Sequence, residues 1–521
     1  MNIYTATLVL PVLASAIPAY PAGWTCQQPD KSSIGGVQVL IGTPAYHFSV
    51  YETYNGTYTT VKDKEDGFIK FAVLDTEGRF APSKYIAGKV DEADLPKLGL
   101  TMDLIEDSHV VAKKCEESDY CMWHAQHNGA SHASPPAGKK TNLVIPIIFK
   151  NHKGIDLMIG DMEQDLFNDD YLSVKDYFLK QSYGKLSLTS EIAKPVTLEK
   201  TEAECTVNMA GLTRALHDCL MEAVDAVKEN VNSYDIVTFM HSGRGAEFGN
   251  QDIDGTYYDD RVWSHSWELP DIGRYAIFSA FYGVSNSHGP RLGTLVHEIG
   301  QALGIPTMYG GFPGFGLGFF DSMASPYGFD GTLSRPGSMS AYTKMRIGWA
   351  DVVEVKDDGP VSVEAVHLSN KIYKISNGFS ATEYLLIENR QAHEYDEGIR
   401  QGGLVIYHID ETANNVAGHP GQGILWPANH YRAAVIQPDG RFDLELMESE
   451  GDKGHFFHDA GYSGINDFGV IRFGDEIVGQ PTIQSYAGGE FTATGISIAE
   501  ISASGDVMSF SVYFADAADE E

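Results

Sequence analysis

Hydrophobic and polar residues recur with different periods along the chain, and these periods predict its helices and strands. The continuous apolar run at 143–149 predicts a buried strand, and residues 234–240 predict a second one. Helical spacing predicts helices over 173–181 and about 212–231. Residues on one face of the second helix are apolar: Leu216, Leu220, Val224 and Val227. Helices and strands that alternate in this way predict an α/β domain over residues 140–355.

The segment before this domain is rich in short β-like runs. It covers residues 22–138 and includes the apolar run 36–41. It ends in a Ser, Pro and Gly linker at 134–138, and Lys139 and Lys140 follow directly. Two interpretations of the basic pair stay open, a proteolytic processing site and an ordinary solvated linker.

The pattern changes again after the α/β domain. Residues 356–515 contain short alternating runs separated by Gly, Asn and Asp, and the runs at 496–501 and 507–512 have a clear period of two. This pattern predicts a C-terminal β-sandwich or jelly-roll-like domain. Residues 516–521 form an acidic tail for which we expect no regular structure.

The N-terminus has the pattern of a secretory signal peptide over residues 1–16. Residues 7–16 are apolar, and Ala14-Ser15-Ala16 fits a cleavage site. The segment is too short to span a bilayer, and no other run of the sequence approaches that length. We therefore expect a secreted, extracellular protein with no membrane partner. In a eukaryote, Asn55 in the sequence Asn55-Gly56-Thr57 would be a possible glycosylation site.

Five cysteines fit an oxidising compartment. Cys205 and Cys219 are plausible partners across a predicted helical stretch, and Cys115 with Cys121 could close a short loop. Cys26 would then be left over. The sequence does not determine the connectivity.

The chain of 521 residues has a formal charge of −34, which argues against nucleic acid as a partner. One interpretation of the charge is solubility. A second is that clustered carboxylates bind Ca²⁺. The candidates for such a calcium site share one Gly-containing loop, although their spacing is not that of an EF-hand: Asp252, Asp254, Asp259 and Asp260.

The run 295–304 is close to the zinc-binding helix of a zincin peptidase. That helix carries His-Glu-x-x-His, because residues four apart share one face and both imidazoles then reach one zinc ion. The Glu between them activates the water bound to the metal. His297 and Glu298 fit this pattern, but Gln301 stands at the second His position. A neutral amide oxygen is a harder and poorer zinc ligand than imidazole.

A second departure follows the helix. In metzincin-type sites the helix ends at a Gly and a third ligand follows three residues later. Gly304 is in place for that turn, but Thr307 stands at the ligand position. Of the three expected ligands, only His297 is retained. Further on, the run 320–325 has the form of a Met-turn, the tight turn whose methionine, here Met323, lies beneath the metal.

Further motifs along the chain match the pattern of one peptidase family. They lie at 27–30, 65–68, 183–188, 262–267, 337–349, 384–391 and 402–410. In their order and spacing, together with the helix and the Met-turn, they resemble the M6 or immune-inhibitor-A-like family of secreted metallopeptidases. The resemblance runs from about residue 25 to about residue 515.

This resemblance implies a metzincin-like (zincin) α/β peptidase domain at 140–355. It also implies a β-rich pro-region at 22–138 and a protein or peptide substrate. By position, His297 would be a zinc ligand and Glu298 the catalytic base. The other two ligand roles do not transfer to Gln301 and Thr307.

Three interpretations follow. The chain is a secreted zinc endopeptidase that takes replacement ligands, for which His265, His288 and Asp321 are candidates. Alternatively, it is a pseudopeptidase that keeps the fold and binds protein or glycan through its cleft or its β domain. A third interpretation, a purely structural secreted protein, predicts that His297 and Glu298 can be replaced without consequence.

Overall fold

The structure is a computed structural model of the chain. It describes residues 24–515 except 44–45, 54–55, 103, 105–135, 158, 160–166, 168–170, 208–211, 250–259, 282–290, 309–314, 414–429, 447, 475, 480 and 487–488. The expected signal peptide at 1–16 and the acidic tail at 516–521 lie outside the described residues, as do Asn55, Cys115 and Cys121.

The chain forms two compact units, and each is built from separate stretches of sequence. Unit 1 comprises residues 1–130, 141–162 and 190–290. Unit 2 comprises residues 131–140, 163–189 and 291–521. The segment 140–355, expected from the sequence as an α/β domain, contributes to both units.

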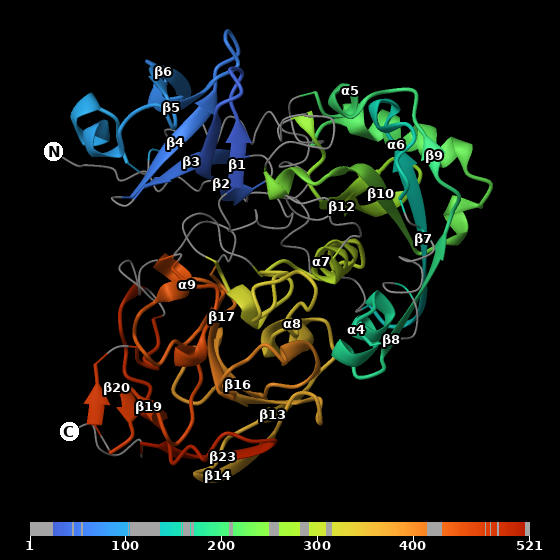
Figure 1. The fold of residues 1–521 in the computed structure, drawn as a ribbon. Coiled ribbons are helices and arrows are strands. Elements are labelled where there is room, and N and C mark those ends of the chain that lie inside the picture. The colour runs from blue at the N-terminus through green and yellow to red at the C-terminus, as the bar shows by residue number, and fades with distance from the viewer. Residues whose placement is uncertain are drawn as a thin grey trace, which may run out of the picture. The chain divides into compact units, whose positions relative to one another are not determined.

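An antiparallel sheet of six strands opens unit 1, and its spatial order follows the chain order (Figure 1). The strands are β1 (Trp24–Gln27), β2 (Ser33–Thr43), β3 (Tyr46–Thr53), β4 (Gly56–Lys62), β5 (Ile69–Leu74) and β6 (Phe80–Ile86). A 3-10 helix, Glu92–Leu98, follows them. The apolar run predicted at 36–41 lies within β2.

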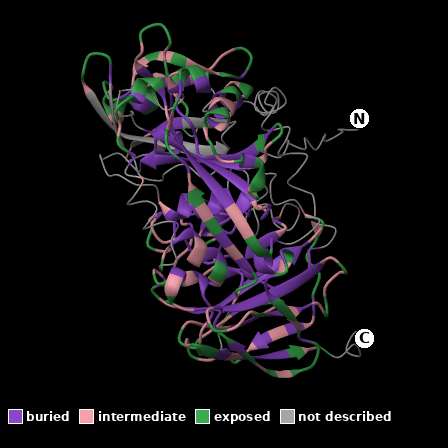
Figure 2. Ribbon diagram, turned by 90° about the vertical axis from the view of Figure 1, so that its right-hand side faces the viewer, coloured by how far each residue is buried: buried purple, intermediate pink, exposed green. Residues whose placement is uncertain are grey.

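A second sheet of six strands has the order β11-β12-β10-β7-β8, with β9 paired to β7. Its strands are β7 (Gly138–Ile148), β8 (Leu186–Ile192), β9 (Val196–Thr197), β10 (Ile236–Arg244), β11 (His265–Leu269) and β12 (Gly273–Phe281). Strand β10 runs parallel to both β7 and β12, whereas β11 and β12 are antiparallel. The strands predicted at 143–149 and 234–240 overlap β7 and β10, although their bounds differ from the observed ones, and β10 is buried along its whole length (Figure 2).

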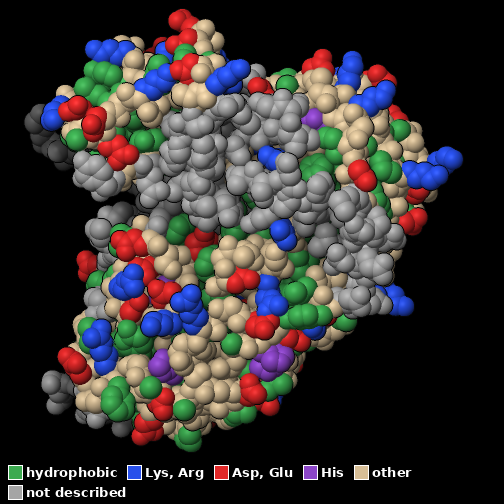
Figure 3. Space-filling view, viewed as in Figure 1, with side chains coloured by type: hydrophobic (Ala, Val, Ile, Leu, Met, Phe, Trp, Pro, Cys, Tyr) green, Lys and Arg blue, Asp and Glu red, His purple; other side chains and the backbone are tan. Residues whose placement is uncertain are grey.

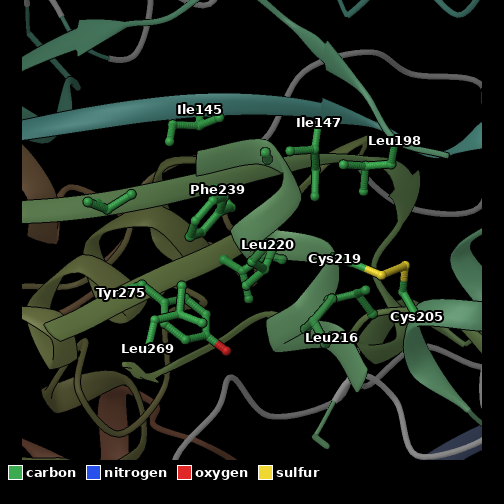
Figure 4. Close-up of a cluster of buried hydrophobic side chains, with 14 of the residues drawn as sticks. Ile145, Ile147, Leu198, Cys205, Leu216, Cys219, Leu220, Phe239, Leu269 and Tyr275 are labelled. Atoms are coloured by element: carbon green, nitrogen blue, oxygen red, sulfur yellow. A yellow bond between two sulfur atoms is a disulfide. The ribbon is translucent and has the colours of Figure 1, made fainter. Parts of the chain in front are cut away.

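Helix α6 (Arg214–Ala226) packs its apolar face on this sheet. Leu216 and Leu220 are buried with Ile145, Phe239 and Tyr275 in one hydrophobic cluster (Figure 4). The predicted apolar face is therefore confirmed, but the helix is shorter than the predicted 212–231. It ends at Ala226 because the β-branched Val227 adopts an extended backbone with ψ 153°. A short 3-10 helix, Val231–Ser233, follows.

A disulfide joins Cys205 of helix α5 (Glu202–Thr206) to Cys219 of α6, with the two Cα atoms 6.1 Å apart. The sequence marks these two cysteines as plausible partners, and Figure 4 shows their disulfide at the edge of the hydrophobic cluster. Two further 3-10 helices in unit 1 are Lys150–His152 and Ala246–Phe248.

Two sheets in unit 2 share one hydrophobic core. Their orders are β13-β15-β16-β17-β18 and β14-β23-β22-β19-β20-β21. Leu385 and Ile406 from the first sheet belong to the same buried cluster as Ile498, Phe510 and Val512 from the second. Two sheets packed over one core have the arrangement of a β-sandwich.

The first of these sheets contains β13 (Asp351–Glu354), β15 (Lys371–Ile375), β16 (Glu383–Arg390), β17 (Gly403–Asp410) and β18 (Ala433–Val435). The second contains β14 (Gly359–Glu364), β19 (Tyr462–Asn466), β20 (Gly469–Arg472), β21 (Glu476–Val478), β22 (Ile496–Ala499) and β23 (Val507–Phe514). The predicted runs at 496–501 and 507–512 lie at β22 and β23. The first ends early, at Ala499, because Glu500 has a positive φ of 54°.

Helices in unit 2 are α4 (Val174–Gln181), α7 (Leu292–Ala302), α8 (Ala341–Arg346) and α9 (Asp443–Leu446). The 3-10 helices of this unit are Gly318–Phe320, Glu394–Asp396 and Lys453–His455. Helix α4 lies where helical spacing predicts it. Among the described residues, no helix has both the length and the apolar character needed to cross a membrane.

The basic pair Lys139 and Lys140 lies in strand β7 rather than in a linker. The backbone before it is hydrogen-bonded, because Gly138 N donates to Lys185 O (2.7 Å) and Trp349 Nε1 donates to Pro136 O (2.8 Å). Directly after it, Asp235 N donates to Thr141 O (3.0 Å). A protease would have to open this pairing before it could cleave the pair. On the face seen in Figure 3, acidic and basic side chains lie interspersed.

Candidate active site

Helix α7 carries the incomplete zinc motif, and all its residues are buried. His297 and Glu298 are 0% exposed, and Gln301 is 6% exposed. Residues 297 and 301 are four apart in a regular helix, so their side chains leave it on the same face. The helix therefore presents one imidazole and one amide where a zincin presents two imidazoles.

The helix ends in a glycine turn, as the sequence predicts for residue 304. Gly304 has a φ of 88°, a left-handed conformation that costs glycine little. Gly304 N donates to Gln301 O and Ile305 N donates to Gly300 O, both at 2.8 Å. This pair of bonds is a Schellman motif, which reverses the chain and leads it to Thr307.

The chain after this turn pairs with the predicted Met-turn. Met308 N donates to Met323 O at 2.9 Å, and the adjacent Thr307 is 8% exposed. In the turn itself, the amides of Ala324 and Ser325 both donate to Asp321 O, at 2.8 and 2.9 Å. The candidate ligand position and the methionine turn therefore lie on neighbouring backbone segments.

The side chain of Met323 packs directly against helix α7. A Cβ atom placed on Gly300 would lie only 2.8 Å from Met323 Sδ, which is closer than real Cβ contacts come. Gly300 lies one turn of helix from His297 and next to Gln301. Glycine at this position lets the methionine come up against the helix beside the motif.

A backbone hydrogen bond orients His297. Its Nδ1 lies 2.7 Å from the carbonyl oxygen of Ser322 in the Met-turn, and because a carbonyl only accepts, Nδ1 carries the proton. The lone pair of the neutral ring is then on Nε2. Burial lowers the pKa of His297 to about 4, while the Ser322 bond opposes this shift, so the ring is neutral at pH 7. Zinc-ligating histidines have this arrangement.

Asp321 holds the Met-turn in place. It is fully buried, and its Oδ1 accepts the amide of Met323 at 2.8 Å. Its Oδ2 accepts the amide and hydroxyl of Ser340 at 3.1 and 2.6 Å, and the hydroxyl of Thr343 at 2.5 Å. Burial raises the pKa of Asp321, and these four donors act in the opposite direction. With both oxygens occupied, Asp321 is committed to the turn and not to a metal.

His265, a second candidate for a replacement ligand, is also committed elsewhere. It is 0% exposed in unit 1. Its Nδ1 lies 2.7 Å from Trp263 O and its Nε2 lies 2.9 Å from the Tyr275 hydroxyl. Both ring nitrogens therefore have partners within the protein. The third candidate, His288, lies outside the described residues.

Two side chains that the sequence analysis did not single out position the Met-turn. The Tyr177 hydroxyl of helix α4 lies 2.6 Å from Ser322 Oγ. The buried Arg390 of β16 donates to Phe320 O at 2.9 Å and to Asp396 Oδ1 at 2.7 Å. An arginine at the end of a strand that is buried throughout is the sequence signal that could have identified this ion pair.

These residues do not fit the zinc site of a metzincin. The motif positions supply one well-oriented imidazole, one amide and one hydroxyl, whereas a catalytic zinc takes three strong ligands from His, Asp, Glu or Cys. Asp321 and His265 do not complete the set. The calcium candidates Asp252, Asp254 and Asp259 lie outside the described residues, and only Asp260 lies within them.

The chain matches no model of a known protein family, and a comparison with curated proteins gives no match either.

Proposed function

We propose that this protein is a secreted relative of the M6 metallopeptidases in which peptidase activity is weakened or lost. The proposal rests on the two departures from the zinc motif, Gln301 and Thr307, together with the surroundings of His297. The observation that carries it is the hydrogen bond from His297 Nδ1 to Ser322 O. It ties the retained imidazole to the Met-turn in the way a zinc ligand is tied, while the positions of its partner ligands hold neutral side chains.

The hydrogen bonds that Asp321 and His265 make within the protein favour loss of activity over the use of these residues as replacement ligands. Each would have to give up its hydrogen bonds to reach a metal, and Asp321 would release the turn beneath the helix. Changes to residues that only support metal ligands cost 10–100-fold in affinity or activity. We expect the loss of two direct ligands to cost more than that.

We further propose that such a protein binds peptide or protein chains, or glycans, without cleaving them rapidly. This is the pseudopeptidase alternative from the sequence, and the buried Glu298 keeps the base position of the family. An intact peptidase remains the competing function, and it requires ligands from residues outside those the structure describes.

Restoring the ligand set tests the proposal. The double variant Gln301→His/Thr307→Asp rebuilds the family's ligands, and we expect it to bind zinc and cleave casein at least 100-fold faster than the parent, by the ligand argument above. The triple variant that adds Glu298→Gln is the matched control, and it should lose that cleavage. A parent that already cleaves casein at a rate the double change does not raise would overturn the proposal.

A further inference from the structure

A second group of candidate metal ligands lies in the C-terminal part of unit 2, away from the zinc motif in sequence. It consists of Asp439, Asp443, Asp452 and His455, and we call it the acidic cluster. One ligand atom from each of the four residues lies within 4.8 Å of the others. Asp443 begins helix α9, Asp452 caps the start of the 3-10 helix Lys453–His455, and His455 is the last residue of that helix.

Two members of the acidic cluster are buried with polar atoms that lack a well-aligned hydrogen bond. Asp443 and His455 are both 0% exposed. Within the described part of the chain, both carboxylate oxygens of Asp443 and Nε2 of His455 lack a well-aligned hydrogen bond. The side chains nearest Asp443 are the acidic Glu448 and the exposed Arg441, and His455 Nε2 lies 3.7 Å from Asp443 Oδ2, too far for a hydrogen bond. A buried carboxylate in these surroundings is unfavourable unless a cation compensates it.

Within the described residues, the cation that pairs with these carboxylates is an exposed arginine. Arg441 lies 3.4 Å from Asp443 Oδ2 and 3.8 Å from Asp452 Oδ2, but its side chain is 57% exposed. Three carboxylates therefore face one another in need of a counter-ion.

The backbone around the acidic cluster is shaped to bring these carboxylates together. The amide of Arg441 donates to Asp439 Oδ1 at 3.1 Å, and the amide of Gly454 donates to Asp452 Oδ1 at 2.6 Å. A Cβ atom on Gly454 would lie 2.3 Å from Asp439 Oδ2 and 3.0 Å from Asp452 Oδ1. Only glycine lets the chain pass this close to both carboxylates.

We propose that Asp439, Asp443 and Asp452 bind a hard divalent cation, Ca²⁺. Carboxylate oxygens are the ligands that Ca²⁺ prefers. His455 Nδ1 lies 3.4 Å from the amide of Asp452 and accepts from it, so the neutral ring carries its proton on Nε2. His455 is therefore a positioning residue beside the carboxylates and not a ligand, which disfavours Zn²⁺ and other ions that seek imidazole.

The proposed ion would stabilise the segment that leads into the Met-turn. Phe315 N donates to Leu444 O at 2.8 Å, and Phe319 N donates to Glu450 O at 2.7 Å. Both acceptors belong to the chain between Asp443 and Asp452. Fixing the ends of that chain with an ion should protect these two amides from exchange with solvent.

Calorimetric titration of the EDTA-treated full chain with CaCl₂ tests the site directly, with thermal melts beside it. We expect one Ca²⁺ per chain at the acidic cluster, and a Tm higher by roughly 5 °C at a hundredfold excess over Kd. Amide exchange at Phe315 and Phe319 should slow when Ca²⁺ binds.

Three variants and one control distinguish the possible outcomes. Asp443→Asn and Asp439→Asn should each abolish the calcium shift but raise the Tm in EDTA, because each removes repulsion from an empty cluster. The exposed Asp459→Asn should change neither measurement, and His455→Gln should retain Ca²⁺ binding.

A calcium response that survives in both cluster variants overturns the site. Binding of Zn²⁺ instead, lost in His455→Gln, overturns the assignment to a hard cation. None of these readouts depends on peptidase activity.

Discussion

At the scale of single residues, Asp321 holds the Met-turn against helix α8. One buried carboxylate joins the Met-turn to the start of helix α8, because it accepts the amide of Met323 and the hydroxyl of Ser340 at the same time. The carbonyl oxygen that accepts the hydrogen bond from His297 Nδ1 belongs to that turn. The orientation of the imidazole therefore depends on a residue that does not touch it.

Replacing Asp321 by asparagine should destabilise the protein by about 3 kcal/mol, because an amide group would then meet donors that now bind a carboxylate. Urea denaturation of the variant measures this loss. The matched control is Asp330→Asn, since Asp330 is exposed and accepts only the turn amide of Thr332 at 2.8 Å in the described structure. Equal stability of the two variants would contradict the role of Asp321.

Glu450 predicts a pH dependence of stability. Burial raises its pKa from 4.5 to about 7, with a smaller opposing contribution from Ser325. The folded state therefore keeps a proton that the unfolded state releases between pH 4.5 and 7. Stability from this residue is fully present below pH 4.5 and is lost as the pH rises to 7, by on the order of 3 kcal/mol.

The variant Glu450→Gln isolates this effect. The free energy of unfolding of the variant, minus that of the parent, should increase as the pH rises from 4.5 to 7. The parent loses stability over this range, whereas the amide of the variant does not ionise. Urea melts at several pH values in EDTA measure the difference and keep the acidic cluster free of calcium. A difference that stays constant across this window would contradict the buried, protonated state of Glu450.

At the scale of elements, the contact between helix α7 and the Met-turn is the feature that a single substitution tests best. Alanine at residue 300 should favour the helix by about 1 kcal/mol, but its Cβ would press on Met323 Sδ. We expect Gly300→Ala to destabilise the parent by about 1–3 kcal/mol. In a Met323→Ala background, the same change should be neutral or stabilising.

This double-mutant cycle has its control built in, because Gly300→Ala is measured with and without its neighbour. The coupling free energy from chemical denaturation should be about 1–2 kcal/mol. A coupling near zero would mean that the two side chains do not press on each other.

Elements with a strong local pattern were predictable from the sequence. The strands at 143–149 and 234–240 and the face of helix α6 follow directly from apolar periodicity, and the φ of Gly304 follows from the turn after the motif. The predicted end of α6 was wrong, because apolar residues beyond Ala226 pack on the same core although the helix has ended. An apolar pattern shows which residues are buried, and here buried residues continue after the last helical residue.

At the scale of the whole molecule, the residues that long-range folding brings together could not be predicted. The spacing of His297 and Gln301 places them on one helix face, but the His297 acceptor Ser322 is 25 residues away. Arg390 is 70 residues from the carbonyl of Phe320 that it binds. The acidic cluster joins residues scattered over 439–455, with no spacing that the sequence analysis matched to a metal motif.

The division into two compact units was also not predictable from the sequence. Residues 131–140 and 163–189 belong with the chain from 291 onward, whereas 141–162 and 190–290 belong with the N-terminal sheet. Strand β7 begins in one unit and continues in the other. Composition and linkers along the sequence carry no signal for this interleaving, because it depends on which strands pair.

Zinc content of the purified protein, measured by mass spectrometry beside His297→Ala, decides whether the motif on helix α7 binds zinc. We expect much less than one zinc per chain, with no difference between the parent and His297→Ala. The comparison separates zinc at the motif from any ion held by the acidic cluster. About one zinc per chain in the parent, lost in His297→Ala, would contradict the account and show that the motif finds the ligands it needs.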